Sequence, residues 1–151
     1  MYPDPKSVTR VTSLGAGPIG GGWTAHFLAR GYDVTAYLHD ASETPAFMSI
    51  LNTAWSSLTD LGLASGASLD RLRIVTDLEE ALEGAEFVQE SGPERLDIKQ
   101  ALYARMGELL PPSVVIGSST SGLMMSEIQI DCATPERTVI GHPFNPPYLL
   151  P

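Results

Sequence analysis

Three glycines near the amino terminus have the spacing of a phosphate-binding turn. Gly15, Gly17 and Gly20 form the pattern G-x-G-x-x-G in SLGAGPIGGGW, directly after an apolar run typical of a buried strand. The first glycine permits a tight turn, the second lets the backbone approach a pyrophosphate, and the third lets a helix pack closely on the strand. We therefore predict a dinucleotide site lined also by Pro18 and Ile19, with a ligand-free structural turn as the alternative.

A histidine near the other end of the chain is the candidate for proton transfer. His142 lies in GHPFNPPYLLP, residues 141–151, a stretch too rich in proline and glycine to form a helix or a central strand. It follows a short apolar run, so we expect it on a loop just after a strand. Imidazole suits acid–base chemistry because an unperturbed imidazole titrates near neutrality. A single histidine is more often structural, so this residue alone does not decide between the two roles.

An acidic residue roughly 20 positions after the glycines usually binds the ribose hydroxyls of a dinucleotide. In AYLHDAS the candidates are Leu38, His39 and Asp40, of which only Asp40 is acidic, although it comes slightly late. No arginine is close by to hold a 2′-phosphate. We therefore predict NAD rather than NADP as the cofactor, with Asp40 on the ribose.

Alternating strands and helices must position these residues. Continuous or alternating apolar runs predict six strands, at residues 8–14, 34–38, 71–77, 86–91, 114–118 and 138–141. Apolar residues at helical spacing predict helices at 23–30, 43–61, 78–85 and 94–110, and residues 15–22 are predicted as the glycine-rich turn. Strands that alternate with helices pair in parallel, which predicts a Rossmann-like, doubly wound α/β sheet.

Composition limits the kind of protein this is. Eighteen acidic against nine basic residues give a net charge of −9, which argues against nucleic acid or an anionic membrane as a partner. The single cysteine, Cys132, excludes an internal disulfide and fits a reducing cytoplasm. No apolar run is long enough to span a membrane, and the first residues lack the pattern of a signal peptide. The length favours one domain over residues 1–151, and no metal site is expected.

Three further stretches give the chain a family resemblance. FVQESGPERLDIK, GSSTSGL and GHPFNP follow the glycine turn in an order that resembles the amino-terminal NAD-binding domain of the 3-hydroxyacyl-CoA dehydrogenase family. Within that family, VQESGPER and GHPFNPPYLLP look most like the branch that oxidises short free hydroxy acids. The resemblance implies an NAD-dependent dehydrogenase that acts on a small-molecule hydroxy acid, and a homodimeric parent protein.

The same resemblance implies roles for particular residues. His142 matches the base that takes the hydroxyl proton while hydride leaves the same carbon. Ser121 matches a serine near the substrate oxygen and the nicotinamide, and Asn145 matches an asparagine beside the same site. Glu94 and Lys99 match positions that line the cofactor site. Other roles compete: Ser121 could cap the following helix, and the two charged residues could be exposed on one helix.

Two departures from the family bear on cofactor and substrate. The position of the family's ribose-binding acid is occupied by Leu38, so Asp40 would need a local shift to replace it. The positions that hold a serine and a lysine for coenzyme A are Ala54 and Leu61 here, on a predicted helix without Lys or Arg. A free hydroxy acid is therefore favoured over an acyl-CoA. A 3-hydroxybutyryl-CoA dehydrogenase and a non-catalytic dinucleotide-binding module stay as alternatives.

The family also pairs its histidine with a glutamate about a dozen residues further on, followed by a helical domain that carries substrate and dimer contacts. Both would lie beyond Pro151. We therefore expect residues 1–151 to be the cofactor domain of a longer enzyme, without the family's helical carboxy-terminal domain and without turnover on their own.

Overall fold

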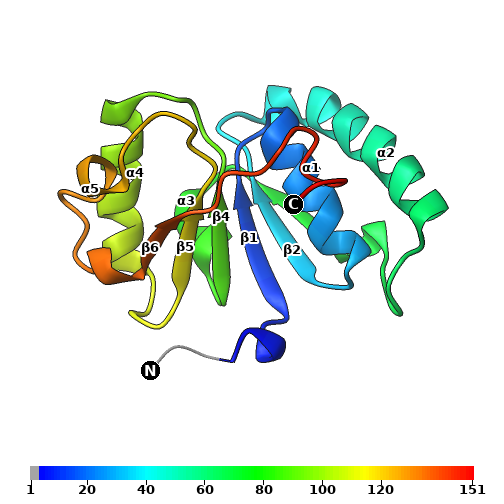
Figure 1. The fold of residues 1–151 in the computed structure, drawn as a ribbon, viewed down its shortest axis with the longest axis horizontal. Helices are drawn as coiled ribbons and strands as arrows, with labels where there is room; N and C mark the ends of the chain where they lie inside the picture. The colour runs from blue at the N-terminus through cyan, green and yellow to red at the C-terminus, as the bar shows by residue number, and fades with distance from the viewer. Residues whose placement is uncertain (1–3) are drawn as a thin grey trace.

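The computed structural model describes residues 4–151 and contains one six-stranded sheet (Figure 1). Neighbouring strands pair in parallel throughout, in the order β3-β2-β1-β4-β5-β6. The strands are β1 (Arg10–Leu14), β2 (Asp33–Tyr37), β3 (Leu72–Val75), β4 (Phe87–Glu90), β5 (Val115–Ser118) and β6 (Thr138–Ile140). The helices are α1 (Pro18–Ala29), α2 (Thr44–Leu61), α3 (Leu78–Leu82), α4 (Leu96–Leu109) and α5 (Met125–Ile128). The predicted doubly wound α/β sheet is confirmed.

Helices cover both faces of the sheet, so its strands are buried on two sides. Figure 1 shows α1 and α2 together beside one face and α4 with α5 beside the other. Apolar side chains of α1 and α2 pack around Val34 of β2 in one core, whereas α3, α4 and α5 pack around Val88 and Ile116 in the other. The two cores explain why Val34, Val88 and Ile116 are almost completely buried in their strands.

Helix α1 begins at Pro18, so the turn predicted over residues 15–22 is shorter than expected. Pro18 stands at the first helical position, where its missing N–H is not needed. Three consecutive glycines, Gly20–Gly22, are part of the helix, and each faces a neighbour too close to leave room for a side chain. An added Cβ would lie 2.1 Å from the Gly15 carbonyl oxygen at Gly20, and 2.7 Å from the Ile50 side chain at Gly21. The glycines therefore reflect tertiary packing rather than a long loop.

The segments that follow β4 and β5 also differ from the prediction. Helix α4 begins at Leu96, so Glu94 precedes the helix and does not share it with Lys99. Helix α5 was not predicted, because a four-residue helix is too short to show an apolar repeat. Buried Arg137 reaches the carboxy-terminal end of α4 and donates to the carbonyl oxygens of Met106 and Leu110. A cation beside the last carbonyl groups of a helix stabilises that end of the helix.

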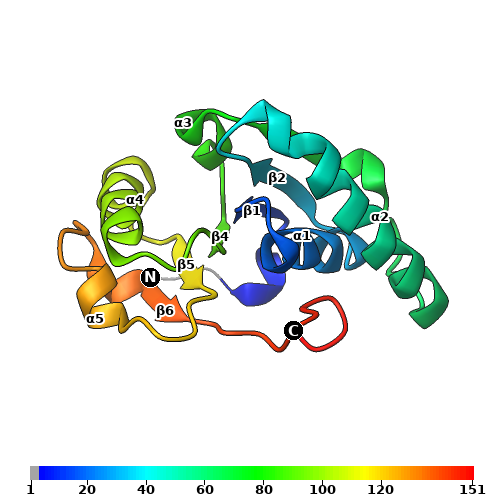
Figure 2. The same ribbon diagram turned by 90° about the horizontal axis from the view of Figure 1, so that it is seen from above.

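The last eleven residues turn back towards α1. Figures 1 and 2 both place this segment beside that helix. Its contact is close, because a Cβ on Gly22 would lie 2.9 Å from the ring of Pro147. No helix among residues 4–151 combines the length and apolar character needed to cross a bilayer.

Candidate cofactor-binding and catalytic site

A cavity of about 660 Å³ lies at the carboxyl ends of β1, β2 and β4. The chain reverses its direction across the sheet between β1 and β4, and ligands of open parallel sheets bind at such a switch point. The lining consists of residues 14–19, Tyr37, His39, Glu43, residues 91–93, Ile98 and Leu102. The glycine turn is therefore part of the wall of this cavity.

The geometry of the glycine turn fits a bound pyrophosphate. Gly15 has a φ of +121°, and a Cβ there would lie 2.4 Å from the Ser91 carbonyl oxygen. Gly17 faces open space, with no atom within 4 Å of an added Cβ. It is the residue before α1 and receives no side-chain cap, so the first N–H groups of the helix are left for a ligand. Of the predicted cofactor residues, Gly15, Gly17, Pro18 and Ile19 line the cavity. Gly20 packs against the Gly15 carbonyl group instead.

The end of β2 differs from the prediction for the ribose. Leu38 is fully buried and packs with Ala36 and Phe47. Asp40 does not line the cavity; its carboxylate accepts the N–H of Ser42 at 2.8 Å and caps a short 3-10 turn, Ala41–Glu43. Hydrogen bonding by the Ser42 side chain, and then by the Ser42 N–H, lowers the pKa of Asp40. Instead, His39 and Glu43 are the residues of this segment that reach the cavity.

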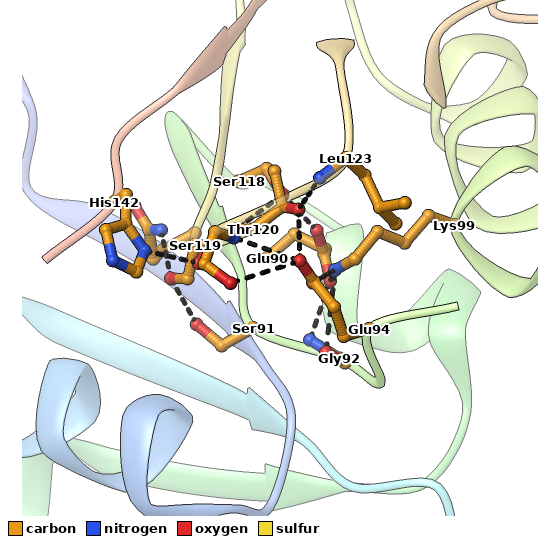
Figure 3. Close-up of polar contacts among 12 residues, drawn as sticks. Glu90, Ser91, Gly92, Glu94, Lys99, Ser118, Ser119, Thr120, Leu123 and His142 are labelled. Atoms are coloured by element: carbon orange, nitrogen blue, oxygen red, sulfur yellow. Dashed lines mark hydrogen bonds and ion pairs between the residues drawn. The ribbon is translucent and has the colours of Figure 1, made fainter. Parts of the chain in front are cut away.

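A buried ion pair lies beneath the cavity, between β4 and α4 (Figure 3). The Lys99 ammonium donates to Glu90 Oε1 at 2.6 Å, and both side chains are almost completely excluded from solvent. Glu90 also accepts the Gly92 N–H and the Ser118 hydroxyl, each at 2.6 Å. Lys99 is thus neither an exposed charge nor part of the cavity wall. The pair fixes the loops after β4 and β5 relative to each other.

Glu94 holds the serine-rich loop that follows β5. Its Oε1 accepts the Thr120 hydroxyl at 2.7 Å and the N–H groups of Ser121 and Gly122 at 3.0 Å. Desolvation acts to raise the pKa of Glu94, but these hydrogen bonds and the Lys99 charge lower it overall. Ser121 does not cap α5, since that helix has Met124 at its N-cap with no side-chain hydrogen bond. Its exposed hydroxyl is 3.4 Å from Glu94.

Ser119, in the loop after β5, contacts both the loop after β4 and helix α1. Its hydroxyl receives hydrogen bonds from Trp23 Nε1 at 3.2 Å and Gln89 Nε2 at 2.9 Å, and lies 2.8 Å from the Ser91 hydroxyl. Trp23 and the Gln89 amide nitrogen only donate, so Ser119 must donate its own proton to Ser91. The Ser91 hydroxyl then keeps its proton for another acceptor, and Ser91 lines the cavity.

The same serine orients the candidate base. His142 Nδ1 lies 3.0 Å from the carbonyl oxygen of Ser119 (Figure 3). Because a carbonyl only accepts, Nδ1 carries the proton of the neutral ring and Nε2 has a lone pair to accept one. The imidazole is exposed, so Nε2 is accessible to a substrate. The structure thus gives His142 the tautomer that a general base requires.

Asn145 lies apart from this cluster, on a second cavity of about 250 Å³. That cavity lies between α2 and the last residues of the chain, and Ser49, Thr53 and Tyr148 also line it. It shares Pro18 with the larger cavity, so the two are neighbours at the start of α1. Among residues 4–151, no group of three His, Cys, Asp or Glu side chains is placed to hold a metal ion.

The comparisons with known proteins agree with the fold. Residues 10–151 match the family described as 3-hydroxyacyl-CoA dehydrogenase, NAD binding domain. The chain therefore belongs to that family, which confirms the resemblance carried by its motifs.

Individual relatives cover nearly the whole chain. It is 56% identical to L-carnitine dehydrogenase of Streptomyces coelicolor over 147 residues, which are 97% of this chain and 46% of the relative. L-carnitine dehydrogenase of Pseudomonas aeruginosa is 49% identical over 139 residues, 92% of this chain and 43% of the relative. The crystal structure of 3-hydroxybutyryl-CoA dehydrogenase from Escherichia coli matches with a TM-score of 0.83 at 30% identity, covering 93% of this chain and 30% of that one. The chain thus spans less than half the length of these relatives.

Proposed function

We propose that this chain supplies the cofactor site and the base of an NAD-dependent dehydrogenase that oxidises a short free 3-hydroxy acid of the carnitine type. The observation that carries the proposal is the contact between His142 Nδ1 and the Ser119 carbonyl oxygen, which leaves Nε2 as a proton acceptor. Bound NAD⁺ would accept the hydride. The relatives named L-carnitine dehydrogenase support this type of reaction.

In this mechanism the chain's own residues handle the proton and the developing carbonyl. His142 Nε2 takes the hydroxyl proton as the C–H electron pair leaves the same carbon, so a secondary alcohol becomes a ketone. Ser121 has an exposed hydroxyl that can donate to the carbonyl oxygen as it forms. Asn145 lies at the neighbouring cavity and would contact the rest of the substrate.

The composition of α2 favours a free acid over an acyl-CoA. Residues 44–61 contain no Lys or Arg, and Asp60 is their only charged residue. The face of α2 on the second cavity has the hydroxyls of Ser49 and Thr53 instead. The several phosphate charges of coenzyme A would find no cation there.

We also propose that residues 1–151 form a single dinucleotide-binding domain and that the whole enzyme works as a homodimer in the cytoplasm. Cys132 is buried and unpaired, which suits a reducing compartment. More than half of each L-carnitine dehydrogenase lies outside the residues that match this chain. We expect turnover to need such additional residues, so residues 1–151 alone should bind NADH without turnover.

The test joins this chain to the remaining part of the Streptomyces coelicolor relative and measures NADH formation with L-carnitine, L-gulonate, 3-hydroxybutyrate and 3-hydroxybutyryl-CoA. We expect activity with a free acid and a fall in kcat of about 10²- to 10⁴-fold in His142→Ala. NADH binding by calorimetry serves as the control, because His142→Ala should leave it unchanged. Activity with the CoA ester alone would indicate the acyl-CoA alternative. Intact NADH binding without activity on any substrate would indicate a non-catalytic module.

A further inference from the structure

The residue that recognises the adenosine ribose is not evident from the sequence, because the end of β2 holds a leucine at the expected acidic position. The Leu38 N–H donates to the Val75 carbonyl oxygen at 3.0 Å, so its backbone continues the sheet. Its side chain is fully buried against Phe47. The N–H and the side chain of Leu38 are therefore both used within the fold.

Asp40, the next acid along the chain, caps a turn instead of lining the cavity. The Asp40 carboxylate accepts the Ser42 N–H at 2.8 Å and forms the N-cap of the turn that leads into α2. It is an exposed side chain outside the cavity wall. Moving it to the cavity would break the cap without bringing a better-placed acceptor.

Glu43 is the last residue of the same turn, and unlike Asp40 it lines the cavity. Its Oε2 accepts the Asp40 N–H at 3.2 Å, which completes a capping box and holds the carboxylate in place. Its second oxygen, Oε1, accepts no hydrogen bond from residues 4–151. A fixed carboxylate with an available oxygen, in the same cavity as the glycine turn, has the chemistry that binds ribose hydroxyls.

The charges around this end of the cavity are negative. Burial raises the pKa of Tyr37, and the carboxylates of Asp77 and Glu43 raise it further. No Lys or Arg lines the cavity. A 2′-phosphate would meet like charge with no Lys or Arg to compensate it, whereas a ribose diol would meet an acceptor.

We propose that Glu43 binds the 2′- and 3′-hydroxyls of the adenosine ribose and makes this site select NAD over NADP. The role of the ribose-binding acid passes from the strand end to the capping box of the 3-10 turn Ala41–Glu43, five residues after the buried Leu38. This inference rests on the proposed NAD-dependent function.

The experiment measures NADH and NADPH binding to the 151-residue chain by calorimetry, for the wild type, Glu43→Gln and Asp40→Asn. Glutamine can still accept the Asp40 N–H, so the cap is retained. We expect Glu43→Gln to weaken NADH by about tenfold or more, as one charge-assisted hydrogen bond is lost, without weakening NADPH. Asp40→Asn, in the same turn, should leave the NADH-to-NADPH ratio unchanged. An unchanged ratio in Glu43→Gln, or the loss appearing in Asp40→Asn, would overturn the assignment.

A comparison of ADP with 2′-deoxy-ADP separates recognition of the ribose from a change in folding. The wild type should prefer ADP, and Glu43→Gln should bind the two equally. If Glu43→Gln weakened both ligands by the same factor, its role would be structural and the proposal would fail. If the wild type bound neither NADH nor ADP, the proposed function itself would fail, independently of Glu43.

Discussion

The two ends of β4 each carry a glutamate, and the two carboxylates do different work. Glu86 precedes the strand at the amino edge of the sheet and accepts the N–H groups of Thr9 and Arg10 at 2.7 and 3.1 Å. Glu90 ends the strand at the carboxyl edge, where Lys99 and Ser118 donate to it at 2.6 Å. The Glu86 side chain is 30% exposed, whereas the Glu90 side chain is completely buried.

Solvent explains the difference. At the amino edge, water screens the charge of Glu86 and can replace a lost partner. At the carboxyl edge no water reaches Glu90, so it depends on Lys99 and on the hydrogen bonds of the surrounding loops. The buried pair lies under the loops that carry Ser91 and Ser119, and the exposed acid only closes the start of β1. The carboxyl edge of the sheet therefore supports the candidate site, whereas the contacts at the amino edge stabilise only the fold.

The largest effect should come from removing the buried ammonium. Lys99→Met leaves the Glu90 carboxylate buried and unpaired, which should lower the free energy of unfolding by about 3–5 kcal/mol. Urea denaturation of the 151-residue chain measures the loss. Lys99→Met combined with Glu90→Gln should recover much of it, because the uncompensated charge is gone. A loss below about 1 kcal/mol in the single variant would contradict the contrast between the two edges.

A second test separates binding from stability at the carboxyl edge. In Gly17→Ala the new methyl meets no protein atom, and the φ of −76° suits alanine, so stability should hold or rise by about 0.4–1 kcal/mol. The methyl would occupy the space of the pyrophosphate, so NADH affinity should fall by about tenfold or more. Gly141→Ala is the matched control, since that glycine also faces open space but lies outside the cavity. Equal NADH affinity in the two variants would show that Gly17 is not part of the binding surface.

The smallest effect is expected at the amino edge and depends on pH. Hydrogen bonds from the N–H of Thr9, then of Arg10, lower the pKa of Glu86 from 4.5 to about 2. A depressed pKa stabilises the fold above the usual carboxyl value and loses that contribution as the pH falls towards 2. Glu86→Gln should therefore lower the free energy of unfolding by about 1 kcal/mol at neutral pH.

The difference between Glu86→Gln and the wild type should shrink as the pH is lowered below 4.5. Chemical unfolding at a series of pH values checks this, with Glu83→Gln, an exposed acid nearby, as the control. A difference that stayed constant with pH would mean that the Glu86 charge does not stabilise the amino edge.

Much of the fold could be predicted because its signals are local. Continuous or alternating apolar runs predicted six strands that the structure contains, and the glycine spacing predicted the turn at the cavity. The errors occurred where distant segments meet. Gly21 and Gly22 are glycines within a helix because a side chain there would collide with Ile50 and Pro147, and no pattern near residue 21 refers to those partners.

The site residues show the same difference between local signals, which could be predicted, and distant contacts, which could not. The motif around His142 indicated a base, but its partner, the Ser119 carbonyl, lies on another strand end. Lys99 was predicted to line the cofactor site or to be exposed, and it does neither, because Glu90 holds it inside. The sequence did contain one signal for this ion pair, which was an acid at the end of a buried strand followed by a lysine on the next helix. Sequence spacing does not tell which way either side chain points.

By itself the sequence determined the order of strands and helices, the glycine turn and the family, because turn chemistry and apolar period act over a few neighbouring residues. Only the tertiary structure decided which carboxylate faces the cavity. Leu38, Asp40 and Glu43 lie within six positions, yet the first packs into a core, the second caps a turn and the third lines the cavity. The direction of each side chain depends on burial against α2 and on the turn between β2 and α2, and both exist only once the sheet has assembled.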